Sequence, residues 1–104
     1  MIKINIKQVN NKINTIEVKG HASYDESGKD IVCASVSSII ITTINGLVNL
    51  KETGFEYEEN DGYVKIVIIE DTKEINALIS NMISLLKDLE KQYSKYIKIY
   101  EEVQ

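Results

Sequence analysis

The chain has 104 residues, of which 43% are hydrophobic, and these values indicate one globular domain, residues 1–104, with a single core. The net charge is −4 and every basic residue is a lysine, so the guanidinium forks that grip bases and phosphates are absent and we expect no direct nucleic-acid binding. A single cysteine excludes an internal disulfide. The first residues alternate in polarity, unlike a signal peptide, and no apolar run approaches the about 20 residues of a membrane span. We therefore expect a cytoplasmic protein with no membrane contact.

The N-terminal segment is predicted to form a β-hairpin. Apolar and polar residues alternate over residues 2–7 and again over residues 16–19, which is the period of a strand with one buried face. Asn10-Asn11, between them, can take the positive φ of a tight turn. Gly20 ends the second strand. The next residues, 21–29, show no apolar period and are expected to form an exposed, mobile loop.

Residues 31–50 contain many β-branched side chains, which favour a strand, but their polar residues recur every three or four positions, which favours a helix. These polar residues are Ser35, Ser38, Thr42, Asn45 and Asn49. Asp30 is a suitable N-cap, and Gly54 follows the expected end. A helix that is apolar around most of its circumference requires burial on two sides. We therefore expect it to pack on the sheet and on a second copy of the chain, in a homodimer.

The second half of the chain is predicted to form another hairpin and another helix. Phe55 starts a short strand, an Asn-Asp-Gly turn follows, and residues 63–69 form the fourth strand. Asp71 or Thr72 caps a helix whose apolar residues keep the 3–4 spacing of one buried face. Residues 96–100 can add a short edge strand. The predicted fold is α+β, a two-layer sandwich in ββαββα order whose mostly antiparallel sheet carries two helices on one face.

The only histidine and the only cysteine, His21 and Cys33, lie on either side of the predicted loop. Cys33 falls in the first turn of the helix, where unpaired N–H groups and the helix dipole favour the reactive thiolate. We expect the N–H groups of Cys33 and Ala34 to bind an oxyanion, and His21 to exchange a proton with the thiol. Two placements of Asp30 stay open, because its carboxylate can cap the helix or orient the imidazole.

Plainer interpretations stand beside this chemistry. Ser37 lies one helical turn after Cys33, where its hydroxyl can contact the thiolate or a substrate, or where a small residue simply packs near the sheet. Cys33 can be a small buried hydrophobe or a redox-sensing thiol, and His21 a surface or capping residue. One histidine and one cysteine are fewer than the three or four ligands that zinc takes, so we expect no metal site.

A motif of small residues around the histidine and the cysteine resembles the signature of the ribosomal-processing cysteine protease family (Prp, also called YsxB-like). It comprises Gly20-His21-Ala22, Gly28, Asp30-Ile31-Val32-Cys33-Ala34 and Ser37. The resemblance extends to the length of the chain, the order of its elements and the amphipathic last helix. It joins several residue types at fixed spacing, which makes it specific.

In that family the matching cysteine is the nucleophile and the matching histidine its base, which assigns these roles to Cys33 and His21. The supporting or substrate-binding positions are then Gly20, Asp30, Ala34 and Ser37. The resemblance implies a homodimeric endopeptidase, without metal or organic cofactor, that removes a short N-terminal extension from a large-subunit ribosomal protein (L twenty-seven) during ribosome assembly. The alternative is a non-catalytic, ribosome-associated protein that uses the same loop and helix start to hold a peptide.

Overall fold

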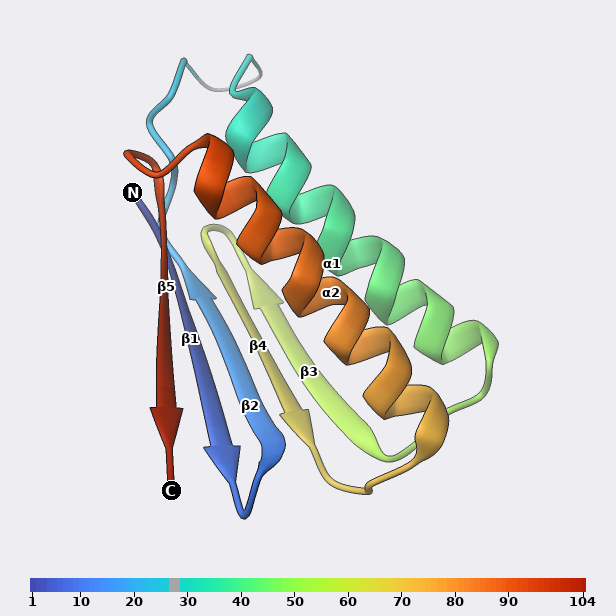
Figure 1. The fold of residues 1–104 in the computed structure, drawn as a ribbon. Helices are drawn as coiled ribbons and strands as arrows, with labels where there is room; N and C mark the ends of the chain where they lie inside the picture. Colours follow the sequence, from blue (N-terminus) through green and yellow to red (C-terminus); the bar gives the residue numbers. More distant parts are fainter. Residues whose placement is uncertain (27–28) are drawn as a thin grey trace.

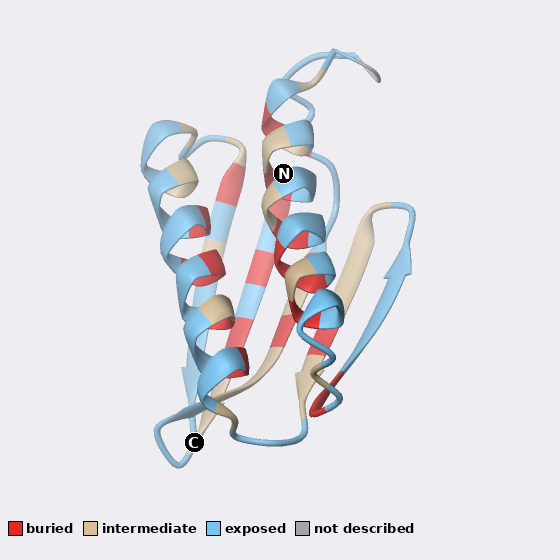
Figure 2. Cartoon of the chain, turned by 90° about the vertical axis from the view of Figure 1, so that its right-hand side faces the viewer, coloured by how far each residue is buried: buried red, intermediate tan, exposed pale blue. Residues whose placement is uncertain are grey.

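The computed structural model describes residues 1–26 and 29–104, which form a five-stranded sheet and two helices (Figure 1). The elements in chain order are β1 (Ile2–Val9), β2 (Lys12–Lys19), α1 (Ile31–Asn49), β3 (Phe55–Asn60), β4 (Tyr63–Ile68), α2 (Lys73–Gln92) and β5 (Ile97–Val103). Both helices lie on one face of the sheet, and the buried residues gather between the two layers (Figure 2). The predicted α+β class is therefore confirmed.

The N-terminal hairpin forms as predicted. Strands β1 and β2 pair antiparallel, and the turn residues Asn10 and Asn11 have φ of 53° and 65°. The inward side chains of both strands are buried, among them Ile4, at 0% exposure, and Ile16, at 1%. Alternation of burial along the strands is the physical reason for the register, because a slip by one residue would turn the apolar set to solvent.

The sheet order is β3-β4-β2-β1-β5. Three of its strand pairs are antiparallel, and the fourth, β1 with β5, is parallel. The C-terminal edge strand is a full strand of seven residues, longer than the predicted segment. Each helix carries the chain over the sheet to a strand that is not the neighbour of the one it left. This arrangement brings the end of β2, the start of α1 and the β3–β4 turn to the same end of the molecule (Figure 1).

The first helix begins and ends close to its predicted positions. Asp30 is its N-cap, and the polar stripe is largely exposed, although Ser35 is half-buried and its hydroxyl donates to the carbonyl of Ile31 at 2.7 Å. The opposite side of α1 packs into the core through Val32, Val36, Ile40, Thr43, Ile44 and Leu47. The second helix, α2, is capped by Thr72, one of the two predicted residues.

Among the described residues, α1 is the one helix with the length and apolar composition of a membrane span. It is also the segment that the sequence predicts to be a helix apolar around most of its circumference. A core helix of a globular fold has the same composition, and α1 packs on the sheet and against α2. Its composition therefore reflects burial on one side, together with Ile31, Ile41 and Val48 exposed beside the polar stripe on the other.

Candidate active site

Five of the six predicted site residues line one open cavity at the N-terminal end of α1. Its volume is about 590 Å³, and its lining consists of His21, Ser23, Asp25, Asp30, Cys33, Ala34, Ser37 and Asp61. A second hollow of about 600 Å³ shares His21, Cys33, Ser37 and Asp61 with the first, and extends between α1 and the β3–β4 hairpin. The histidine and the cysteine therefore lie where the two hollows meet. Gly20 borders the second hollow.

Cys33 is half-buried in the first turn of α1, and its sulfur is held by a backbone donor. The N–H of Ala22 donates to Cys33 Sγ over 3.2 Å. Ala22 is itself buried, at 2% exposure. A hydrogen bond to sulfur stabilises the thiolate more than the thiol, because the donor meets a full negative charge.

Asp30 caps the helix, which decides between the two placements that the sequence left open. Its Oδ1 accepts from the N–H groups of Val32 and Cys33, both at 3.0 Å, and its Oδ2 accepts from the N–H of Tyr24 at 3.0 Å. Desolvation by burial raises the pKa of Asp30, but the backbone hydrogen bonds, led by that of Cys33, outweigh it and hold the pKa below its ordinary value. The carboxylate is therefore ionised and committed to the backbone.

The prediction that the N–H groups of Cys33 and Ala34 bind an oxyanion is wrong for this conformation. The N–H of Cys33 donates to the Asp30 carboxylate, and the N–H of Ala34 donates to the Asp30 carbonyl at 3.1 Å. Both donors are used by the cap, because an aspartate N-cap satisfies the same orphan groups that an anion would bind. Ala34 nevertheless lines the cavity.

His21 is exposed, and its ring lies against the β3–β4 turn. A Cβ added at Gly62 would lie 2.8 Å from His21 Nε2, closer than real Cβ contacts allow. The N–H of Gly20 also donates to the carbonyl of Gly62 at 2.8 Å. In the part of the chain that the structure describes, no hydrogen bond joins the imidazole to Cys33 Sγ. The turn therefore supports the ring beside the cavity that Cys33 also lines.

Gly20 is required by its backbone conformation. Its φ is +94°, and an added Cβ would lie 2.5 Å from the carbonyl oxygen of Met1. Any other residue would displace β1 or the exit of β2, and with it the residue that follows, His21. The glycine at position 28, which belongs to the motif, lies outside the described residues. Ser37 is exposed and lines both hollows.

Sequence reasoning missed the contribution of the β3–β4 turn. Asp61 and Gly62 were predicted only as a hairpin turn, yet they border the site. Ser23 and Asp25 were assigned only to a loop. Nothing in the local pattern could place Asp61 and Gly62 beside His21, because pairing of β2 with β4 is what brings the turn there. Across residues 1–26 and 29–104, no three His, Cys, Asp or Glu side chains are arranged to hold a metal ion.

Comparison with known proteins agrees with this geometry. The family model described as cysteine protease Prp matches residues 1–98. The chain belongs to the Prp cysteine protease family. A curated Prp relative, the ribosomal processing cysteine protease of Mycoplasma genitalium, is 36% identical over 104 residues, which cover 98% of this chain and 97% of the relative. The Prp of Staphylococcus aureus is 28% identical over 91 residues, 85% of this chain and 86% of the relative.

Solved Prp structures share the fold. The Staphylococcus aureus Prp with a covalently linked product peptide superposes with a TM-score of 0.93, at 24% identity, over 98% of this chain and all of that one. The same protein with a substrate peptide gives a TM-score of 0.87, at 23% identity and the same coverage. As a Prp family member, the chain is a cysteine protease.

Proposed function

We propose that this protein is an endopeptidase that removes the N-terminal extension of a large-subunit ribosomal protein (L twenty-seven) in the cytoplasm, during ribosome assembly. Cys33 is the nucleophile and His21 the base. The observation that carries the assignment is that a chain of the cysteine protease family has one cysteine, and this cysteine borders the same cavity as the one histidine. The curated relatives named ribosomal processing proteases support the substrate class.

The reaction follows from the groups at the cavity. The Cys33 thiolate attacks the scissile carbonyl carbon, and a C–S bond forms as the C–N bond breaks. His21 takes the thiol proton and then gives it to the departing amine. Water attacks the thioester carbonyl, the C–S bond breaks, and the new carboxyl terminus leaves with the thiol restored. Because no hydrogen bond joins these two side chains within the described structure, we expect the substrate to bring them together.

The residues around Cys33 and His21 have separate supporting roles in the proposed reaction. The N–H of Ala22 stabilises the thiolate at 3.2 Å, and Asp30 holds the first turn of α1 that carries it. Ser37 and Ala34 lie on the cavity wall, where they can contact the peptide. Gly20 sets the direction in which His21 leaves β2.

The second hollow suits a peptide with apolar residues near the cut. Its apolar lining comes from the sheet and α1, and comprises Val18, Val36, Ile40 and Val64. Its rim carries the carboxylates Glu59 and Asp61, which favour approach of a basic partner. A ribosomal protein with an apolar extension on a basic body would match both features.

A homodimer is part of the proposal, and the exposed side of α1 is its interface. This side carries large apolar residues, at 51% exposure for Ile31, 44% for Ile41 and 52% for Val48, with no charged residue in the helix. Ile41 and Val48, seven residues apart, lie close together around the helix, and exposed apolar side chains gathered in this way are typical of protein interfaces. A two-fold pairing of α1 helices would bury the same stripe on both copies.

The test compares the wild-type protein with Cys33→Ala on a peptide that copies the N-terminal extension of the same organism's ribosomal protein. Mass spectrometry should find one cut made by the wild type and none by Cys33→Ala, while fluorescence anisotropy finds the peptide bound by both. Ser35→Ala is the matched control, since this small residue of the same helix bonds to Ile31 and lies outside the cavity lining. A peptide that both proteins bind and neither cuts would favour the non-catalytic binding protein instead.

A further inference from the structure

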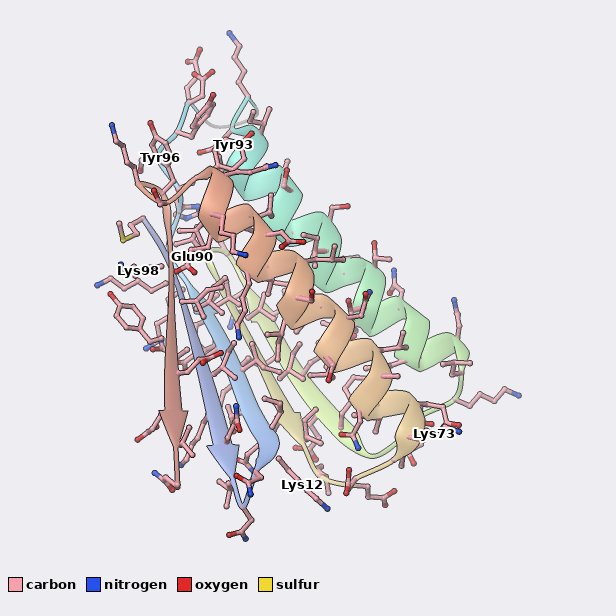
Figure 3. All side chains as sticks on the ribbon, in the orientation of Figure 1. Lys12, Lys73, Glu90, Tyr93, Tyr96 and Lys98 are labelled. Atoms are coloured by element: carbon pink, nitrogen blue, oxygen red, sulfur yellow. The ribbon has the colours of Figure 1, made fainter. Side chains whose placement is uncertain are left out.

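A cluster of three tyrosines joins the segment after His21 to the junction between α2 and β5. The ring of Tyr24 meets Tyr93 edge-on, with centroids 5.8 Å apart and planes at 86°, and meets Tyr96 at 5.0 Å and 75°. Figure 3 places Tyr93 and Tyr96 where the chain passes from α2 to β5. Such edge-to-face pairs contribute stability beyond the area they bury. Tyr24 therefore ties a loop beside the cavity to a junction distant in the sequence.

The two tyrosines that contact the Tyr24 ring, Tyr93 and Tyr96, are anchored to the rest of the fold. Tyr93 is the C-cap of α2, and both Tyr93 and Tyr96 pack against the hydrophobic core. The carbonyl of Tyr96 accepts from the N–H of Ile2 at 2.8 Å, and the N–H of Ile97 donates to the carbonyl of Tyr93 at 3.1 Å. The backbone that carries the two rings is thus hydrogen-bonded to β1 and β5.

The same short segment is bonded to the nucleophile's helix at two further points. The N–H of Tyr24 donates to Asp30 Oδ2 at 3.0 Å, while the other oxygen of that carboxylate holds the N–H of Cys33. Two residues before Tyr24, the N–H of Ala22 donates to Cys33 Sγ at 3.2 Å. The orientation of both donors depends on the backbone of residues 22–24, and the Tyr24 ring is the part of this segment that reaches the α2–β5 junction.

We propose that Tyr24 is a positioning residue for Cys33. Its ring, packed on Tyr93 and Tyr96, keeps the Ala22 N–H directed at the sulfur and its own N–H on the Asp30 cap. Without that anchor the segment moves away from α1, and the thiolate loses a hydrogen-bond donor. The contacts are made by the ring, so phenylalanine at this position should serve as well as tyrosine. The effect on peptide cleavage rests on the proposed function, whereas the effect on thiol reactivity does not.

The experiment measures the rate of Cys33 alkylation by iodoacetamide between about pH 5 and 9, where thiolate formation controls the rate. At neutral pH, Tyr24→Ala should react about tenfold more slowly than the wild type, a factor equivalent to about 1.4 kcal/mol. Its rate profile should move to higher pH. Tyr24→Phe should keep the wild-type profile. Tyr96→Ala, which removes the partner ring of the closer pair, should reproduce part of the loss.

Tyr100→Ala is the matched control, since this tyrosine is 46% exposed on β5 and belongs to neither the cluster nor the cavity lining. In peptide cleavage, Tyr24→Ala should lower kcat about tenfold and change KM by no more than about twofold, because the ring supports the thiolate and not the substrate. Thermal unfolding followed by circular dichroism identifies any variant that does not fold, and the Tyr96→Ala result then carries the test.

Faster or unchanged alkylation in Tyr24→Ala would overturn the proposal, since a tyrosine that merely covers the thiol would expose it when removed. A loss in Tyr24→Phe equal to that in Tyr24→Ala would overturn it as well. If no variant, nor the wild type, cuts the peptide while the alkylation pattern holds, then the proposed function fails and the positioning role stands. Normal cleavage with an unchanged alkylation profile would mean that the positioning role fails and the proposed function stands.

Discussion

The two helices cover the same sheet, yet their outward surfaces differ. Over Ile31–Asn49, α1 carries no charged residue, while α2 carries six over Lys73–Gln92. The inward stripes of both helices are buried against the sheet. Outward, α1 exposes several large apolar residues, whereas Leu85 is the one that α2 exposes. The inward surfaces are what the fold requires, and the difference outward agrees with the proposal that α1 meets a substrate and a second chain while α2 faces water.

The N-terminal caps of the two helices also differ. The carboxylate of Asp30 accepts three backbone N–H groups, one of them from Tyr24 in the loop beside the site. The hydroxyl of Thr72 accepts one, from Ile75 at 3.2 Å in its own helix. One cap thus joins the helix to the site, and the other completes only its helix.

Replacing the two caps is the sharpest way to test this difference. Asp30→Ala and Thr72→Ala should each lower the free energy of unfolding by about 1 kcal/mol, the usual contribution of a helix N-cap. Peptide cleavage should fall on the order of 10²-fold in Asp30→Ala alone, because displaced reacting groups lose that much rate. Urea unfolding and the cleavage assay measure the two effects. Equal losses of activity in both variants would contradict a special role for the first cap.

A lysine placed on the outward surface should have different effects on α1 and on α2. Ile41→Lys should weaken the proposed homodimer by about thirtyfold, because a lysine would be desolvated at the centre of the proposed α1 interface. Leu85→Lys is a matched control, since Leu85 is 42% exposed on α2 and Ile41 is 44% exposed on α1. Sedimentation at graded concentrations measures the dissociation constant. A dimer weakened by Leu85→Lys and not by Ile41→Lys would move the interface to α2.

The smallest expected effect is a pH dependence of the free energy of unfolding that comes from the Asp30 cap. The Asp30 pKa is held below its ordinary value by the backbone N–H groups, against the effect of burial. The stabilisation is therefore complete above the unfolded pKa of about 3.9, and is lost as the pH falls through the lower folded pKa. Urea titrations at graded pH should find a free-energy difference between wild type and Asp30→Ser that shrinks below about pH 4. Thr72→Ser should give a difference independent of pH, and a parallel fall in both would disprove the assignment.

Much of the fold could be predicted because its signals are local. Alternation in β1 and β2, the Asn10-Asn11 turn and the Asp30 cap each depend on neighbours within a few residues. The β-branched first helix was the harder case, and its polar stripe decided it, since a helix places such residues on one side. The motif around His21 and Cys33 was also visible, because its members lie within one short segment of the chain.

The sequence by itself thus determined the elements and the family, and it pointed to the pair of side chains that we propose to react. Only the tertiary structure decided that β5 pairs parallel with β1, that Gly62 lies against His21 and that Tyr24 packs on Tyr93 and Tyr96. It also decided that the Asp30 cap uses the N–H groups once expected to bind an oxyanion. The physical reason is that these contacts join residues far apart in the chain, and local periodicity contains no information about which distant partners packing and strand pairing bring together.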